Sequence, residues 1–164
     1  MLRSTLSAAA LAAGFLIVPP SGGAHGHDAG PLHIGHPWIR ATAAGAPTAA
    51  GYLTVTNHGA VADRLIGGTS PLARSIEPHT MTMAGGVMRM RLAKDGFVIA
   101  PGATLNLAPG GGHLMLIAPT RAFKAGERAP VTLRFANAGD VKVDFVVETD
   151  APAANAAMPG MAMH

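Results

Sequence analysis

The chain has 164 residues, enough for one domain with its own hydrophobic core, and no cysteine that could form a disulfide. Only 13% of the residues are charged and the formal net charge is +3. Because no Lys/Arg cluster accompanies this charge, nucleic-acid binding has little support.

The first 24 residues have the pattern of a cleavable signal peptide. Arg3 supplies a positive start, an apolar run follows from Leu6 to Val18, and Gly22 to Ala24 are small residues suited to a signal peptidase. The apolar run is shorter than the roughly 20 residues needed to span a bilayer. We therefore predict a periplasmic protein that does not span the membrane after cleavage.

Residues 25–30 are predicted to form a flexible, histidine-containing N-terminus. If cleavage falls after Ala24, the mature chain begins His25-Gly26-His27. A free amino group, backbone amides and an imidazole at the third position form a square-planar nitrogen set that suits Cu(II). The alternative is a polar terminus with incidental histidines.

From residue 31 to 149 the pattern is that of a β domain. Short alternating or apolar stretches are separated by turns rich in Gly and Pro, and no helical periodicity follows the leader. The predicted strands cover residues 52–56, 63–70, 72–78, 97–100, 104–107, 114–118, 131–135 and 141–147. This spacing predicts an all-β, antiparallel sandwich or barrel.

Histidine and methionine recur at alternating positions between residues 79 and 115. His79, Met81 and Met83 would share one face of a strand. A two-residue turn at Gly85-Gly86 would place Met81 opposite Met90 on the returning strand. The sequence His113-Leu114-Met115 repeats the same-face arrangement further along the chain.

Thioether sulfur is a soft donor that selects Cu(I), and imidazole binds copper in either oxidation state. Zinc would normally require cysteine or more histidine. The mixed Met/His set therefore predicts a copper site, with Cu(I) as the bound ion. The alternative is that these methionines fill irregular gaps in the core.

Residues 150–164 are predicted to form a flexible tail without amphipathic pattern. The tail ends in a group of metal-binding side chains, namely Met158, Met161, Met163 and His164. With His25 and His27, these residues are candidates for a secondary copper site, which could hold Cu(I) or Cu(II). The alternative is a nonfunctional terminus.

These residues resemble the periplasmic copper chaperones of the PCu(A)C family. Ten residues separate His79 from Met90, as in the family motif, and His113-x-Met115 completes it. The interval of twenty-two residues between Met90 and His113 is one longer than usual. We place the extra residue in the turn 93–96, where an insertion is tolerated. The resemblance also covers residues 38–41, 51–57 and 85–90.

The resemblance implies a cupredoxin-like Greek-key sandwich that binds Cu(I) through His79, Met90, His113 and Met115. Met81 is a possible auxiliary donor, because the hairpin places it opposite Met90. The family's role implies delivery of copper to the copper domain of apo cytochrome c oxidase, with a thiol-containing chaperone as a further partner. We expect a monomer.

Three other functions are alternatives to a copper chaperone. A blue-copper electron carrier needs a Cys thiolate, which this chain does not have. A copper enzyme using an N-terminal histidine would need further histidines fixed on the core beside His25. Most of the remaining histidines are scattered or lie in the Met/His set, so we predict that the protein is not an enzyme. A buffering or resistance protein that sequesters copper without specific delivery stays as the alternative.

Overall fold

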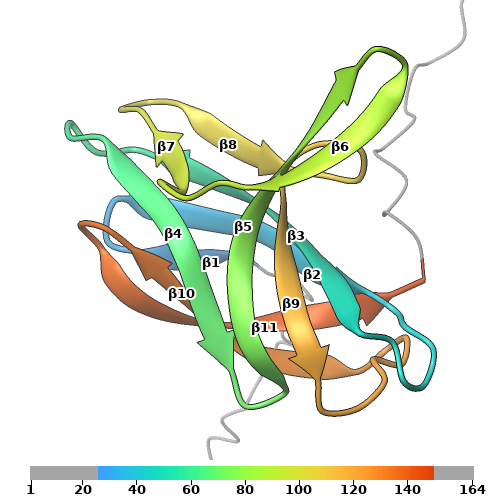
Figure 1. Ribbon diagram of the computed structural model, residues 1–164. Coiled ribbons are helices and arrows are strands. Elements are labelled where there is room, and N and C mark those ends of the chain that lie inside the picture. Colours follow the sequence, from blue (N-terminus) through green and yellow to red (C-terminus); the bar gives the residue numbers. More distant parts are fainter. Residues whose placement is uncertain (1–25, 150–164) are drawn as a thin grey trace, which may run out of the picture.

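The computed structural model describes residues 26–149, all of its regular structure being β (Figure 1). The predicted signal peptide, His25 and the tail 150–164 lie outside the described residues. The strands are β1 (His27–Ala29), β2 (Leu32–Arg40), β3 (Thr48–Asn57), β4 (Asp63–Ser70), β5 (Ala73–Ala84), β6 (Val87–Leu92), β7 (Phe97–Ile99), β8 (Thr104–Leu107), β9 (His113–Pro119), β10 (Arg128–Phe135) and β11 (Gly139–Glu148).

Seven strands close into a barrel. Their order is β2-β11-β10-β4-β5-β9-β3, and β3 pairs back with β2. The pairing of β11 with β2 is parallel, whereas the other pairings around the barrel are antiparallel. β1, β6, β7 and β8 are attached to barrel strands at their edges. The all-β fold predicted from the sequence is confirmed.

Alternation along the strands builds the core. In β11, Val141, Val143, Phe145 and Val147 all face inward and are buried, as the sequence predicts. In β9, Leu114 and Leu116 are each 1% exposed and face the same interior. Met115, which lies between them, therefore points to the opposite face of the strand.

β5 is longer than the sequence indicates, because the predicted strand 72–78 and the methionine-bearing stretch after it form one strand. Pro78 does not interrupt it. β4 pairs with β5 as far as Ile76, and β6 pairs from His79 onward. Pro78 therefore lies between the part of β5 that pairs with β4 and the part that pairs with β6. Its missing N–H removes no ladder hydrogen bond to either strand. β5 therefore belongs both to the barrel and to the hairpin.

Two segments differ from the sequence prediction near the N-terminus. Residues 27–29, predicted as part of a flexible stretch, form β1 and pair with β2 in register His27 to Ile34. β2 itself was not predicted as a strand. Its histidines and glycine obscure the pattern, and a register shift between Gly35 and Trp38 interrupts the alternation of buried and exposed residues.

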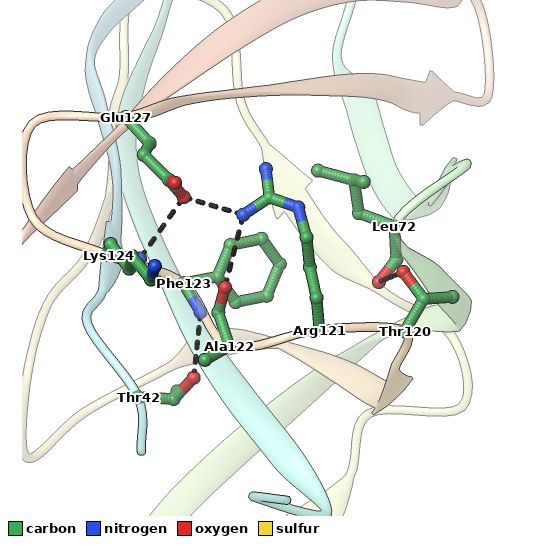
Figure 2. A network of polar contacts seen from close by, with 8 residues as sticks. All are labelled: Thr42, Leu72, Thr120, Arg121, Ala122, Phe123, Lys124 and Glu127. Atoms are coloured by element: carbon green, nitrogen blue, oxygen red, sulfur yellow. Dashed lines mark hydrogen bonds and ion pairs between the residues drawn. The ribbon is translucent and has the colours of Figure 1, made fainter. Parts of the chain in front are cut away.

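The loop that joins β9 to β10 lies at the end of β9 remote from His113, and polar contacts around Phe123 hold it in place (Figure 2). The Phe123 N–H donates to Thr42 Oγ1 at 3.0 Å, and the Thr42 N–H donates to the Phe123 carbonyl at 2.9 Å. Arg121 donates to Glu127 at 2.6 Å, which with the Lys124 N–H lowers the pKa of the Glu127 carboxyl. The loop thereby holds the Phe123 ring in the core.

Phe123 is 1% exposed. Truncation to alanine should lower the free energy of unfolding by about 3–5 kcal/mol, because both ring burial and packing are lost. Denaturant unfolding of the Phe123→Ala variant measures this loss. Val98→Ala, at a strand position that is 59% exposed, is the control and should change stability by less than about 0.5 kcal/mol. Equal effects in the two variants would contradict the assigned role of Phe123.

Candidate metal centre

The hairpin of β5 and β6 projects beyond the barrel and carries four methionines (Figure 1). Ala84 pairs with Val87 across a two-residue turn. Gly85 and Gly86 have φ values of 58° and 75°, as a type I′ turn requires of both central residues. Met81 then pairs with Met90, so the predicted hairpin register is confirmed.

β9 lies along the other edge of β5 and brings the second histidine to the first. His79 pairs directly with His113, and Glu77 pairs with Met115. The two imidazole rings are stacked, with centroids 5.9 Å apart and an angle of 25° between their planes. Residues that are far apart in the sequence therefore meet as cross-strand neighbours.

All the predicted primary ligands share one face of this three-stranded region. Directly paired residues point to the same side of a sheet, as do residues two apart on one strand. His79 and His113 are thus on one side, with Met115 two residues from His113. Met81 is two residues from His79, and its partner Met90 completes the set. The register places these five side chains on the face opposite the core.

Each histidine has one nitrogen in contact with a protein oxygen, and the other has no hydrogen-bond partner among residues 26–149. His79 Nε2 is 3.4 Å from the Glu77 carboxylate, and His79 Nδ1 is buried with no hydrogen-bond partner. His113 Nδ1 lies 3.2 Å from the Gly111 carbonyl, to which it donates. These contacts place the protons on His79 Nε2 and His113 Nδ1. The lone pairs of His79 Nδ1 and His113 Nε2 can then bind a metal ion.

The electrostatic surroundings favour neutral imidazole at His113. Burial lowers the pKa of His113, opposed by the hydrogen bond to Gly111 and assisted by the neighbouring His79. A metal ion binds the neutral form of imidazole, so a lowered pKa reduces competition from protons. Burial also raises the pKa of Tyr52, whose ring centroid is 6.4 Å from that of His113 and 4.5 Å from that of Trp38. Tyr52 therefore lies beside the imidazole of His113, and Trp38 packs against Tyr52.

Exposure increases from the histidines toward the hairpin. His113 is 4% exposed and the side chain of His79 is 13% exposed. Met81 and Met115 are half-buried, whereas Met90 is 45% exposed. An ion reaching this centre would therefore meet sulfur first and nitrogen last.

The donor set limits which metal fits. Among residues 26–149, no group of three or more His, Cys, Asp or Glu residues is arranged to hold a metal ion. The neighbours of the two histidines on the same face include Met81, Met90 and Met115, and such a mixture of imidazole and thioether fits copper better than zinc or a hard cation. The orphaned, buried nitrogen of His79 is consistent with a site that receives an ion.

Sequence reasoning missed three groups that support this centre. Glu77 contacts His79, the Gly111 carbonyl orients His113, and Tyr52 covers it. Glu77 could have been found, because it is two residues from His79 and so shares its face. The other two contacts depend on how the loop before β9 and strand β3 pack, which periodicity alone does not specify.

The remaining histidines lie in other surroundings. His27 is exposed on β1, away from the β5–β9 pairing, while His25 and the tail methionines lie outside the described residues. His33 pairs with Asp28 at 2.6 Å and His36 with Glu148 at 3.3 Å. His58 is exposed in the turn after β3.

Comparisons with known proteins identify the family and agree with the fold. Residues 32–147 match the model of the family described as "Putative lipoprotein LpqE-like". A relative from Leifsonia xyli subsp. xyli, "Putative lipoprotein Lxx21020", is 36% identical over 120 residues, which cover 73% of this chain and 71% of that protein.

Two solved structures are similar along most of this chain. One is the copper-bound PCuAC domain from PmoF2, with 33% identity and a TM-score of 0.64 over 78% of this chain and 99% of that chain. The other is the solution structure of Cu(I)-DR1885 from Deinococcus radiodurans, with 27% identity and a TM-score of 0.59 over 78% and 83% of the two chains.

The barrel with its projecting hairpin is thus a cupredoxin-like β fold of the PCuAC type. The chain belongs to the LpqE-like family of PCuAC domain proteins, as the sequence motif predicts. Within residues 26–149, the structure contains no helix long and apolar enough to cross a membrane.

The hydrogen bond to Gly111 and the burial of His113 predict its state without copper. Long-range ¹H–¹⁵N NMR should show the Nδ1–H tautomer of His113, with a pKa below the ordinary value for histidine. A pH titration of the copper-free protein measures both properties. An Nε2–H tautomer would contradict the arrangement, because Nε2 would then lack a free lone pair.

Proposed function

We propose that this protein is an exported carrier of Cu(I), bound by His79, Met90, His113 and Met115. Met81 is an auxiliary donor beside Met90. The observation that carries the proposal is the meeting of His79 and His113 across β5 and β9, with one nitrogen of each ring left without a protein partner. Copper completes the bonding of a buried nitrogen that otherwise has no partner.

The sulfur donors favour the reduced ion. Thioethers are soft and neutral, so they stabilise Cu(I) in preference to Cu(II). The similar protein DR1885 has been solved with Cu(I), and the similar PmoF2 domain with copper. Neither similarity identifies the ligands of this chain; the assignment depends on register, burial and the two free nitrogens.

A carrier must also release its ion. In the proposed site, the 45% exposed Met90 is the ligand that a partner can displace first. The more buried histidines would hold copper until the partner has supplied its own donors. We therefore assign this protein a binding and transfer role and no catalytic step.

The proposed recipient is the copper domain of apo cytochrome c oxidase, with a thiol-containing copper chaperone as a further partner. We further propose that residues 1–24 direct export to the periplasm, which the lipoprotein description of the relative supports. Residues 31–149 form the copper-binding domain, and the protein acts as a monomer. His25 and His27, together with the tail residues Met158, Met161, Met163 and His164, form a secondary copper site.

Removal of one buried ligand should weaken binding strongly. We expect His113→Ala to reduce Cu(I) affinity by at least about tenfold, equivalent to about 1.4 kcal/mol. Anaerobic titration against a competing Cu(I) chelator measures this change. The matched control, His58→Ala, removes an exposed turn histidine and should leave the affinity unchanged. If the two variants behave alike, the ligand assignment is wrong.

Deletion of residues 150–164 should leave one tightly bound Cu(I) in the β domain and remove only the weaker binding that depends on the tail residues. The same anaerobic titration applied to full-length and truncated protein counts the ions. Loss of all tight binding in the truncated form would refute the core site. Transfer of the retained ion to an apo cytochrome c oxidase copper domain then separates a carrier from a buffering protein, which would retain it.

A further inference from the structure

The hairpin carries a second pair of methionines beyond the proposed site. Met83 and Met88 are directly paired across β5 and β6, one step nearer the turn than Met81 and Met90. They are 65% and 46% exposed. Side chains that are directly opposite across antiparallel strands are rooted about 5 Å apart. Three rotatable bonds in each methionine allow the two sulfurs to converge on one ion.

The two methionine pairs and His79 form a continuous series along one face. Met83, Met81 and His79 are successive same-face residues of β5. Each step along a strand between such residues is about 7 Å, since the rise is about 3.4 Å per residue. The length of a methionine side chain can bridge much of that step. The series runs from the exposed end of the hairpin to the buried histidines.

The chemistry of the hairpin differs between its two faces. The face opposite the methionines carries Thr80 and Thr82 on β5, paired with Arg91 and Arg89 on β6. The sulfur-bearing side chains are therefore confined to the face that the proposed copper ligands share. An apolar surface for protein contact could be made with leucine or valine and would not need sulfur. Confinement of four thioethers to the copper-facing side favours a role in binding the ion.

We propose that Met83 and Met88 form an outer Cu(I) site, through which copper enters and leaves the inner centre. This inference deepens the proposed carrier function and depends on it. The ion moves by ligand exchange: a new Cu–S bond to Met81 or Met90 forms as a bond to Met83 or Met88 breaks. All these donors are neutral thioethers, so copper stays Cu(I) and neither electrons nor protons are transferred.

Two thioethers bind Cu(I) more weakly than a set that also includes two imidazoles. The outer site therefore fills after the inner one and empties first, and its exposed position makes it the point of contact with a copper donor or acceptor. A partner presenting soft ligands can join the ion there before the inner ligands release it. The exposed end of the hairpin is thus the exchange site of the carrier.

The test uses Ag(I), a redox-stable monovalent ion with similar preference for sulfur, and full-length protein with ¹³C-labelled methionine methyl groups. Methyl resonances of Met90 and Met115 should shift during the first equivalent. Those of Met83 and Met88 should shift together in a later, weaker phase. In the Met83→Leu/Met88→Leu variant, the first phase should be unchanged. Anaerobic Cu(I) release from this variant to a chelator should slow several-fold.

Three further variants separate metal binding from surface shape. Met83→His, with Met88 kept, replaces one copper donor by another and should release Cu(I) fast. Met83→Leu, with Met88 kept, lacks this donor and should release Cu(I) slowly. Thr82→Leu, on the opposite face of the same strand, should release Cu(I) at the wild-type rate. Absence of any shift at Met83 and Met88, or wild-type release from the double leucine variant, would overturn the outer site. Absence of shifts at Met90 and Met115 would instead refute the inner site.

Discussion

The pairing of β5 with β9 is the constraint on which the proposed copper centre depends. This register sets His79 against His113 and places Met115 one same-face step away. A slip of one residue would turn the histidine of one strand to the face opposite that of the other. The register is fixed by the barrel core, because Ile76 pairs with Leu116 and both are buried on the opposite face. Packing of the hydrophobic core thereby fixes the positions of His79 and His113, which lie outside the core.

The centre combines two environments that serve different needs. The imidazoles are buried, oriented by Glu77 and Gly111, and hold their free nitrogens in fixed positions. The thioethers reach outward along a hairpin that extends past the barrel, with exposure increasing toward the turn. Fixed ligands that cannot be displaced would suit a permanently bound cofactor. Displaceable ligands without fixed positions would bind the ion with little affinity. A transported ion requires both, and the continuous strand β5 carries both.

The proposed carrier function accounts for the apolar exposure of the hairpin, which is unusual on the surface of a folded domain. Exposed Met83, Val87, Met88, Met90 and Leu92 lie on one two-stranded extension. Such concentrated apolar exposure commonly marks a binding surface. Methionine also remains neutral and binds soft ions, so the same surface can contact a partner and exchange copper with it.

The amino-acid sequence by itself determined the strand-rich character, the two-residue hairpin turn, the pairing of Met81 with Met90 and the preference of the donors for copper. These features depend on alternation, turn chemistry and ligand softness, which are local properties. It did not reveal β2, β1 or the continuity of β5 past Pro78, because a register shift and a change of neighbouring strand disguise the local pattern. Only the tertiary structure decided that His79 faces His113, that Tyr52 covers it and that Gly111 orients it. Those contacts join segments distant in the sequence, and their register is set by the packing of the whole barrel.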